Sequence, residues 1–265
     1  EGMSPMSTPA AVRVWESHWT LYRAIWKSNM AGAFVQPLLY LLGMGVGVGA
    51  LVNRNTGSSD LLGGLTYFEF LAPAMLATTA MMIGTQESLW PVMGGFKWQR
   101  TFLAQAASPL SPGEITSGLL LWQLTRALIA VGGVAAVLVL FDGTRSWGLL
   151  AAVPFGALTA GAFAAPLTAW AATRERESSF PSILRFGIVP LFLFGGAFYP
   201  ISELPGWMQP IARVTPLWHG VELCRNVVHG TLGWADATGH VAVLAAYVVV
   251  GTVLARLAFA RRLAE

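Results

Sequence analysis

The chain has 265 residues, 55% of them hydrophobic and only 11% charged, with a formal net charge of +3 and a mean hydropathy of +0.59. Soluble domains carry about 25% charged residues, so this chain has too little polar surface to enclose a soluble globule of its length. The composition therefore predicts an integral membrane protein. Cys224 is the single cysteine, which excludes an internal disulfide and a cysteine metal cluster.

Residues 1–29 are polar and aromatic, and four aromatic residues recur at helical spacing. Trp15, Trp19, Tyr22 and Trp26 therefore share one face of a helix. The pattern predicts an amphipathic helix in the membrane interface. The alternative is an aromatic face buried against the chain's own spans. The apolar run that follows is a full span, too long for the core of a signal peptide, so we expect no cleavable signal.

Six later windows are long and apolar enough, or nearly so, to cross a bilayer as helices. They are residues 30–52, 68–90, 115–141, 147–173, 186–200 and 238–259. The fifth is short, because Pro190 and the pair Gly195-Gly196 weaken the helix before Pro200 ends it. The expected fold is a single all-α polytopic membrane domain with six transmembrane helices.

Basic residues predict the orientation of these spans, because Lys and Arg are enriched in cytoplasmic loops. Eleven lie on the side that carries both termini and four on the opposite side. The eleven are Arg13, Arg23, Lys27, Lys97, Arg100, Arg174, Arg176, Arg185, Arg256, Arg261 and Arg262; the four are Arg54, Arg145, Arg213 and Arg225. We therefore expect both termini in the cytoplasm and the protein in the cell membrane.

Two charged residues fall within the predicted spans, Glu87 in the second and Arg126 in the third. An arginine at the centre of a span costs about 2.5 to 3.5 kcal/mol, so a partner or a wet cavity is expected. The second and third spans are antiparallel neighbours, and both charges lie in their cytoplasmic halves. An ion pair between them and a snorkelling Arg126 are both compatible with the sequence.

The sequence contains no nucleotide-binding motif, because residues 22–26, directly before Lys27, include no glycine and Lys97 is followed by Trp98 where a P-loop needs Ser or Thr. If ATP drives this protein, another chain binds it.

The alternating glycines from Gly43 to Gly49 lie inside an apolar span, where their GxxxG spacing favours close helix packing, within or between subunits. His219 and Glu222 would share a helix face, but metal sites need three or four ligands, so we expect no metal.

Two connections are too apolar to be solvated loops. Residues 91–114 contain a short amphipathic pattern, with Phe96, Trp98, Phe102 and Leu103 beside Lys97 and Arg100. This predicts a cytoplasmic helix that rests on lipid or docks in a groove of a soluble partner.

The second apolar connection, residues 199–222, is interrupted by Pro200, Pro205, Pro210 and Pro216. Non-helical backbone at membrane depth must be covered, which predicts a re-entrant external segment.

Two stretches carry a resemblance to a known family. FLAPAMLATTAM…QES…WQRTFLAQAASPLSPGEI, from Phe70 onward, and GGAFYPISELPGWMQPIARVTPLWHGVEL resemble permease subunits of type 2 ATP-binding-cassette exporters. The branch with the nodulation lipo-oligosaccharide and daunorubicin-type exporter permeases is the most similar. The resemblance implies a half-transporter that pairs with a second permease, as homodimer or heterodimer, and exports an amphipathic or lipid-like substrate.

The resemblance also implies roles for the two apolar connections. Residues 94–105 would couple to one of two separate ATPase subunits, which bind ATP and Mg, while this chain binds no cofactor. The coupling residues would be Phe96, Lys97, Trp98, Arg100, Thr101 and Phe102. The external segment would form re-entrant helices, over residues 199–217, that act as an outer gate sealed by packing and not by charge. The gate residues would be Phe198, Tyr199, Pro200, Leu204, Pro205, Trp207, Pro210 and Pro216.

Three other classes of protein compete with an exporter permease. An ion-coupled secondary transporter would be expected to carry acidic residues near the membrane midplane and often an internal repeat, and the sequence shows neither. An intramembrane enzyme would need a catalytic constellation, which is also missing. A non-transporting membrane scaffold remains as an alternative.

Overall fold

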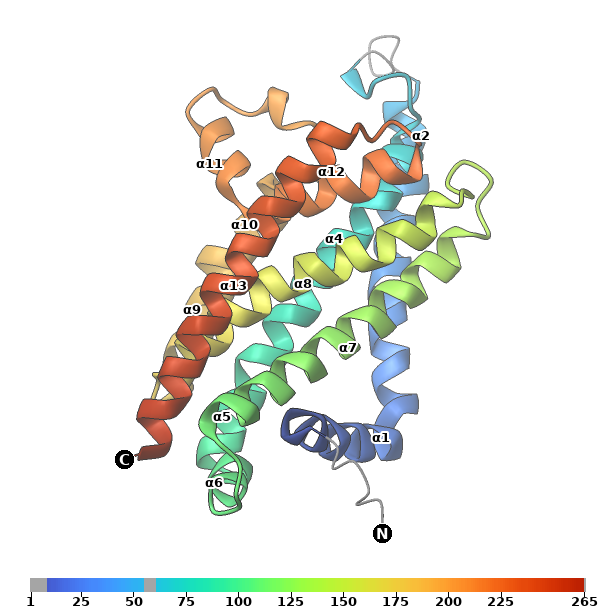
Figure 1. Ribbon diagram of the computed structural model, residues 1–265. Coiled ribbons are helices and arrows are strands. Elements are labelled where there is room, and N and C mark those ends of the chain that lie inside the picture. The colour runs from blue at the N-terminus through green and yellow to red at the C-terminus, as the bar shows by residue number, and fades with distance from the viewer. Residues whose placement is uncertain (1–8, 55–60, 265) are drawn as a thin grey trace.

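The computed structural model describes residues 9–54 and 61–264, and within these ranges the chain is helical and has no strand (Figure 1). The all-α membrane fold is thereby confirmed. Five helical segments are long and apolar enough to cross a membrane. They are Tyr67–Lys97, Pro112–Leu138, Gly148–Ala172, Glu177–Phe194 and Trp234–Ala264. The first predicted span, 30–52, is not among these five segments; its apolar part is the shorter helix Pro37–Val52.

The N-terminal segment and the first predicted span form one continuous helical path. Helix α1 runs over Ala10–Tyr40, passes into a π-helix at Leu41–Val48 and ends in α2 at Gly49–Val52. Figure 1 shows the dark blue first part of α1 lying across the bundle and the lighter blue remainder running along it. The predicted N-terminal helix and first span are therefore parts of one helical path that changes direction.

The next helices begin where the sequence provides caps. Thr66 with Glu69, and Ser111 with Glu114, form capping boxes at the starts of α4 (Tyr67–Ser88) and α7 (Pro112–Leu138). A break at Leu89 separates α4 from α5 (Trp90–Lys97), and Arg100, in the left-handed region with φ 53°, precedes α6 (Thr101–Ala106). Helix α8 spans Gly148–Ala172.

The fifth predicted span ends earlier than expected. A 3₁₀ turn (Glu177–Ser179), α9 (Phe180–Ile183), a π-helix (Leu184–Ile188) and α10 (Val189–Phe194) form one path. This path stops at Phe194, short of the predicted Pro200, because Gly196 turns the chain at φ 82°. The chain continues through a 3₁₀ turn at Ile201–Glu203 and α11 at Met208–Val214. It ends with α12 at Pro216–Val228 and α13 at Trp234–Ala264.

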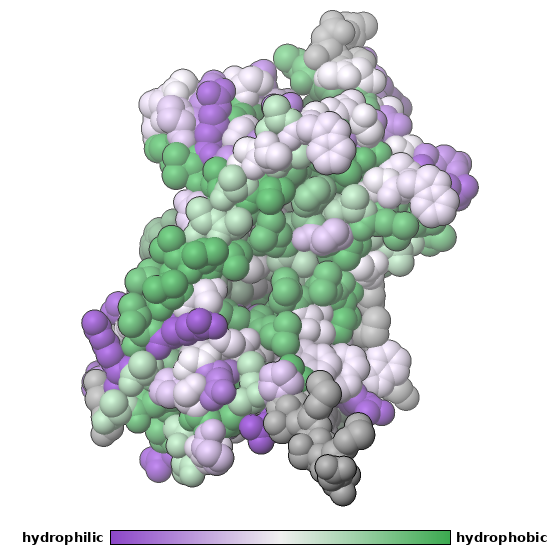
Figure 2. Space-filling view, viewed as in Figure 1, coloured by the Kyte–Doolittle hydropathy of each residue, from purple (hydrophilic) through white to green (hydrophobic). Residues whose placement is uncertain are grey.

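Helix α8 is the centre of the bundle and contacts α4, α7, α12 and α13. Burial differs greatly among the spans: 83% of the apolar window of Tyr67–Lys97 is buried, but only 17% of that of Trp234–Ala264. Figure 2 shows an apolar band across the middle of the molecule, with hydrophilic side chains gathered toward its two ends. Helix α4 therefore lies inside the bundle, and α13 faces outward.

The glycine run of the first predicted span packs mainly on one side. A side chain at Gly45 would meet Phe68 at 2.8 Å, and one at Gly49 would meet Tyr67 at 3.6 Å, both on α4. A side chain at Gly43 would meet nothing within 4 Å. One GxxxG pair therefore packs within the subunit, and Gly43 faces open space.

The molecule has two polar ends. We call the end where α1 begins at Ala10, α13 ends at Ala264 and α5 meets α6 the terminal face (Figure 1). The opposite end, which carries the connection after α7 together with α11 and α12, is the distal face.

Candidate functional site

The predicted coupling segment is a turn between α5 and α6 on the terminal face. Lys97, Trp98, Arg100 and Thr101 are exposed there, and Trp98 exposes 53% of its surface. Lys97 Nζ donates to the backbone oxygen of Glu175 at 3.1 Å, which ties the turn to the connection after α8.

Phe96 and Phe102 do not share this exposed surface, contrary to the sequence interpretation. They expose 6% and 1% of their surface. Their rings pack on each other and on Phe259 of α13, with ring centroids 4.8 to 5.1 Å apart. Apolar rings at a turn gain more by burial within the bundle than by facing water. These two residues therefore anchor the turn from inside.

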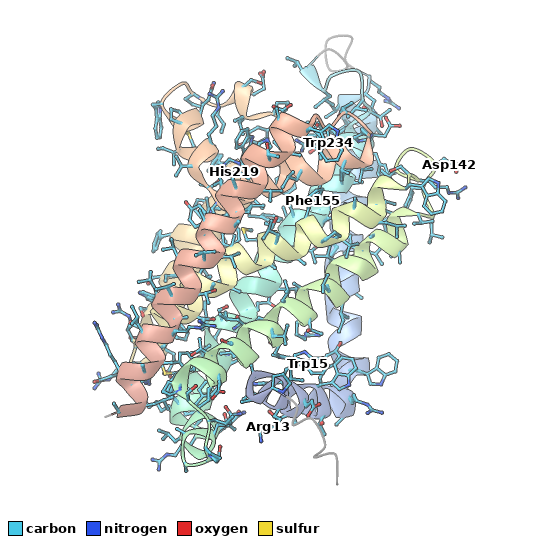
Figure 3. The ribbon with its side chains drawn as sticks, viewed as in Figure 1. Arg13, Trp15, Asp142, Phe155, His219 and Trp234 are labelled. Carbon is cyan, nitrogen blue, oxygen red and sulfur yellow. The ribbon has the colours of Figure 1, made fainter. Side chains whose placement is uncertain are left out.

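The N-terminal aromatic face packs against the chain's own bundle, the alternative to the predicted interfacial stripe. Trp15, beside α7 in Figure 3, donates from Nε1 to Thr125 Oγ1 at 2.9 Å. Trp19 and Tyr22 make edge contacts with Trp122 of α7, with centroids 6.5 and 5.5 Å apart. Trp26 is 45% exposed. The first three aromatic residues thus hold α1 against α7.

Glu87 and Arg126 form an ion pair, with Arg126 Nε 2.9 Å from Glu87 Oε1; 9% of the Arg126 side-chain surface and 18% of the Glu87 side-chain surface are exposed. The Arg126 guanidinium also lies over the ring of Tyr22, 4.5 Å from its centroid. Gln123 Nε2 donates to the backbone oxygen of Glu87 and to Thr168 Oγ1, each at 3.0 Å. The structure therefore contains the pair, and this polar cluster joins α1, α4, α7 and α8.

The predicted gate residues fall into two groups on the distal side. Phe198, Leu204 and Pro216 are buried, and Tyr199 and Pro200 are half-buried. Phe198 packs edge-on against Phe192, with centroids 5.0 Å apart. The exposed group is Pro205, Trp207 and Pro210, with Trp207 exposing 70% of its surface. The segment is thus anchored at its two ends and exposed at its tip.

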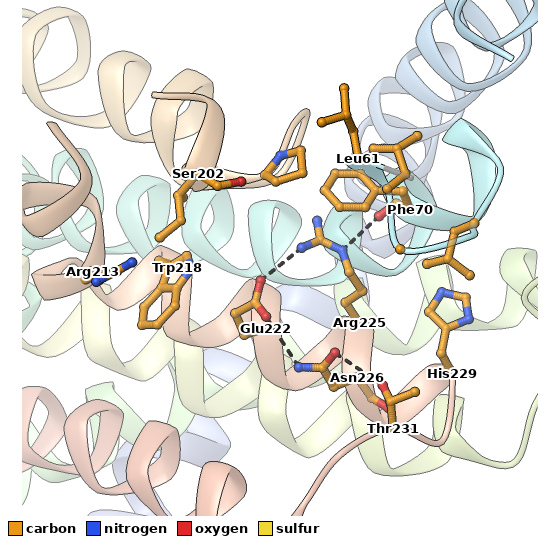
Figure 4. Close-up of a pocket in the computed structure, with 15 residues that line it drawn as sticks. Leu61, Phe70, Ser202, Arg213, Trp218, Glu222, Arg225, Asn226, His229 and Thr231 are labelled. Carbon is orange, nitrogen blue, oxygen red and sulfur yellow. Dashed lines mark hydrogen bonds and ion pairs between the residues drawn. The ribbon is translucent and has the colours of Figure 1, made fainter. Parts of the chain in front are cut away.

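Arg225 on α12, which the sequence interpretation used only to count charges, holds the root of this segment (Figure 4). Its Nε donates to the backbone oxygen of Phe70 at 3.1 Å and its Nη2 to that of Gly196 at 2.8 Å. Its Nη1 pairs with Glu222 Oε1 at 3.0 Å, and the guanidinium lies 3.7 Å from the Phe70 ring centroid. Charge therefore contributes to the placement of the segment, contrary to the expectation of packing alone.

Burial lowers the pKa of Arg225 to about 10, while the neighbouring Glu222 acts in the opposite direction. The group therefore stays protonated at neutral pH. Glu222 also accepts from Asn226 Nδ2 at 3.3 Å. A pocket of about 680 Å³ opens beside this pair, bounded also by Trp218 and His229 (Figure 4). The i,i+3 spacing of Glu222 and Arg225 was the signal in the sequence that could have identified the pair.

His219 contacts a histidine and not the carboxylate that shares its helix face. Its Nδ1 lies 2.7 Å from Nδ1 of His240 on α13. Burial lowers the pKa of His219 below its ordinary value, and His240 acts in the same direction. Among the described residues, no group of three or more His, Cys, Asp or Glu side chains could hold a metal ion.

A bundle of apolar spans, with an exposed turn at one face and a folded-back segment at the other, defines a polytopic membrane protein. The sequence model of the ABC-2 type transporter family matches residues 11–228, and the chain belongs to this family. It is a membrane-spanning half-transporter of an ATP-binding-cassette exporter, located in the inner membrane, and such permeases associate with ATPase subunits that use ATP and Mg.

Individual relatives agree with the family assignment. The chain is 32% identical to Nodulation protein J of Rhizobium leguminosarum bv. trifolii over 255 residues, 95% of this chain and 93% of the relative. It is 30% identical over 255 residues to Nodulation protein J of Rhizobium meliloti, with the same coverage. It is 28% identical to the daunorubicin resistance ABC transporter permease protein DrrB1 of Streptomyces coeruleorubidus, over 64% of this chain and 60% of the relative.

Proposed function

We propose that the chain pairs with a second permease and two separate ATPase subunits to export an amphipathic or lipid-like substrate, such as a glycolipid, a lipid or a drug. The observation that carries this proposal is the similarity, over nearly the whole chain, to proteins named for nodulation, together with the similarity to a daunorubicin resistance permease. Helices α9, α10 and α13, which expose most of their apolar surface, suit contact with lipid or a second permease.

The exposed turn between α5 and α6 is the proposed contact with the ATPase. Lys97, Trp98, Arg100 and Thr101 would lie in the interface. An exposed tryptophan flanked by cations is typical of the residues that dominate protein interfaces. Phe96 and Phe102 would transmit movement of the turn to α13, because both pack on Phe259.

The proposed topology has six spans, with the later part of α1 together with Pro37–Val52 as the first, and both termini in the cytoplasm. Supporting this, the Lys and Arg count favours the terminal face by eleven to four. Residues 199–222 would be re-entrant and form the outer gate. The exposed Pro205, Trp207 and Pro210 would meet the second permease at the mouth of the pathway.

Replacing Trp98 with a charged residue tests the coupling surface. Trp98→Glu is expected to reduce the amount of ATPase subunit that co-purifies by about 30-fold, the effect of losing a hot spot worth about 2 kcal/mol. ATP-dependent export by the complex in proteoliposomes should fall with it. The matched control is Trp147→Glu, because Trp147 is 88% exposed at the distal face.

Two outcomes would contradict the proposal. Full retention of the ATPase by Trp98→Glu would remove the coupling role from the α5–α6 turn. Export that needs no ATPase subunit and stops when an ionophore collapses the ion gradient would favour the ion-coupled transporter instead.

A further inference from the structure

A groove separate from the predicted coupling and gate residues lies between the ends of α8 and α13 on the terminal face. It encloses about 580 Å³, and its walls are apolar, including Pro166, Ala169, Leu254 and Leu257. Leu254 and Leu257 expose 50% and 52% of their surface, so the apolar wall is open to the surroundings of the bundle. An open apolar wall on a membrane-spanning helix suits an acyl chain.

Three arginines line the polar end of this groove: Arg174, Arg261 and Arg262. Glu175 is the acidic side chain among the lining residues, so the lining carries an excess of positive charge. In Figure 2, hydrophilic side chains gather where α13 ends, directly beyond its apolar surface. A second pocket of about 650 Å³ adjoins this one through Glu175 and Arg262 and adds Lys97, Arg100 and Arg176.

The three arginines of the groove differ in the contacts that they make. Arg262 Nη1 donates to the backbone oxygen of Ala172 at 2.8 Å, so it caps the end of α8 and offsets the negative end of the helix dipole. Arg174 lies over the ring of Trp170, 5.0 Å from its centroid. Arg174 and Arg261 are exposed at the groove. These two guanidiniums can therefore bind a phosphate from outside the chain.

The spacing along α13 fits a membrane lipid. Arg261 follows Leu254 by seven residues, which is about 10 Å along a helix. This is the separation between the upper part of an acyl chain and its phosphate. Trp170, which lines the same groove, is the residue type that prefers the headgroup level. Basic pockets between spanning helices bind anionic headgroups, and a zwitterionic lipid would gain less because its ammonium group opposes the arginines.

We propose that the groove between α8 and α13 is a binding site for one anionic phospholipid, with acyl chains on Leu254 and Leu257 and the phosphate between Arg174 and Arg261. The lipid is a resident of the transporter and not its cargo. The site does not depend on the substrate or direction of transport.

The test is lipid binding by the purified full chain in detergent, titrated with phosphatidylglycerol or phosphatidylcholine and followed by native mass spectrometry. The double variant Arg174→Gln/Arg261→Gln should bind phosphatidylglycerol about 10- to 30-fold more weakly, since each basic residue near a lipid surface contributes about 1 kcal/mol. Phosphatidylcholine binding should change little. The control Arg145→Gln/Arg213→Gln removes two exposed arginines from the distal face and should leave binding unchanged.

A second variant separates a lipid from a free anion. Leu257→Asn should weaken phosphatidylglycerol binding several-fold while leaving the arginines in place. The proposal would be overturned by equal phosphatidylglycerol binding in the double variant, or by displacement of the lipid by millimolar inorganic phosphate. It would also be overturned if the double variant lost a co-purifying ATPase subunit but kept its lipid, which would assign these arginines to a protein partner.

Discussion

Arg225 is a single side chain that connects three separate parts of the chain at the distal face. It bonds the backbone of α4 at Phe70, the turn after α10 at Gly196 and the carboxylate of Glu222 on its own helix. A guanidinium presents five donors in a rigid plane, so it can satisfy two carbonyls and a carboxylate together. The ammonium group of lysine is a point charge and could not match this arrangement.

Arg225→Leu is therefore expected to destabilise the protein by about 3 kcal/mol, because the change removes the cation paired with the half-buried Glu222 and one donor from each of two backbone oxygens. The control is Arg145→Leu, whose pair with Asp142 is exposed, with 59% and 95% of the side-chain surfaces accessible. Exposed pairs contribute about 0 to 1 kcal/mol. The melting temperature of the purified protein in detergent measures both changes. Equal melting of the two variants would show that the Arg225 contacts contribute little.

The sequence offered the pair of Glu87 and Arg126 as one of two alternatives and missed the pair of Glu222 and Arg225, for a physical reason. Glu87 and Arg126 lie inside apolar runs, where any charge is costly and therefore conspicuous. Arg225 follows a stretch rich in prolines and polar residues, where a charge looks like ordinary loop polarity. Only the fold brings Phe70 and Gly196 to it, across 155 and 29 positions of sequence.

At the scale of helices, close contacts between α8 and its neighbours depend on glycine. A side chain at Gly84 of α4 would lie 2.5 Å from the backbone oxygen of Ala160 on α8. Small residues allow such approach of helix backbones in membranes, where no solvent drives the helices together. Because the opposing atom belongs to the backbone, it cannot move aside as a flexible side chain would.

Gly84→Ala is accordingly expected to cost about 2 kcal/mol or more, within the range for overpacked interiors. Gly132→Ala is the matched control in α7, since a side chain there would meet nothing within 4 Å. That substitution should be neutral or stabilising by up to about 1 kcal/mol, because alanine favours helix more than glycine does. Thermal unfolding of the two variants side by side checks the difference. A Gly84→Ala variant that is as stable as the parent would show that α4 and α8 can separate without cost.

The sequence predicted the positions of helices along the chain better than it predicted what each helix contacts. The predicted span at 147–173 differs from α8 by one residue at each end, because an apolar run determines length. Helix α12 was expected only as part of a re-entrant external segment ending at residue 222, since its polar residues and its 13-residue length do not resemble a span. Phe96 and Phe102 were expected on a surface because amphipathicity shows which residues cluster but not whether the cluster faces a partner or the chain itself.

At the scale of the whole molecule, the hydropathy of a span does not show whether that span lies in the core of the bundle. The most apolar candidate span, Trp234–Ala264, is among the least buried, whereas Tyr67–Lys97, far less apolar, is the most buried. The lipid around a membrane protein is as apolar as the protein interior, so an apolar helix need not be buried inside the bundle. The sequence therefore predicted that these segments cross the membrane, but could not predict which of them lies at the centre.

The proposed orientation of the bundle rests on the distribution of charge and can be tested by labelling. Cys224 is buried, so a Cys224→Ala background removes the single native thiol without changing the surface. Asp142→Cys places a thiol on the exposed connection at the distal face, and Ser108→Cys places one at the exposed end of α6 on the terminal face. A membrane-impermeant maleimide applied to intact spheroplasts should label position 142 and leave position 108 unlabelled, because the excess of basic residues on the terminal face predicts that this face lies in the cytoplasm.

Permeabilised cells are the control for this labelling, since both positions should then react and so prove that each thiol is accessible. The reverse pattern in intact spheroplasts would invert the molecule and place α5 and α6 outside. The α5–α6 turn could then not contact an ATPase, because ATP is in the cytoplasm. Labelling at both positions in intact spheroplasts would mean that the chain crosses the membrane an even number of times, or not at all, between residues 108 and 142, which contradicts a single crossing by α7.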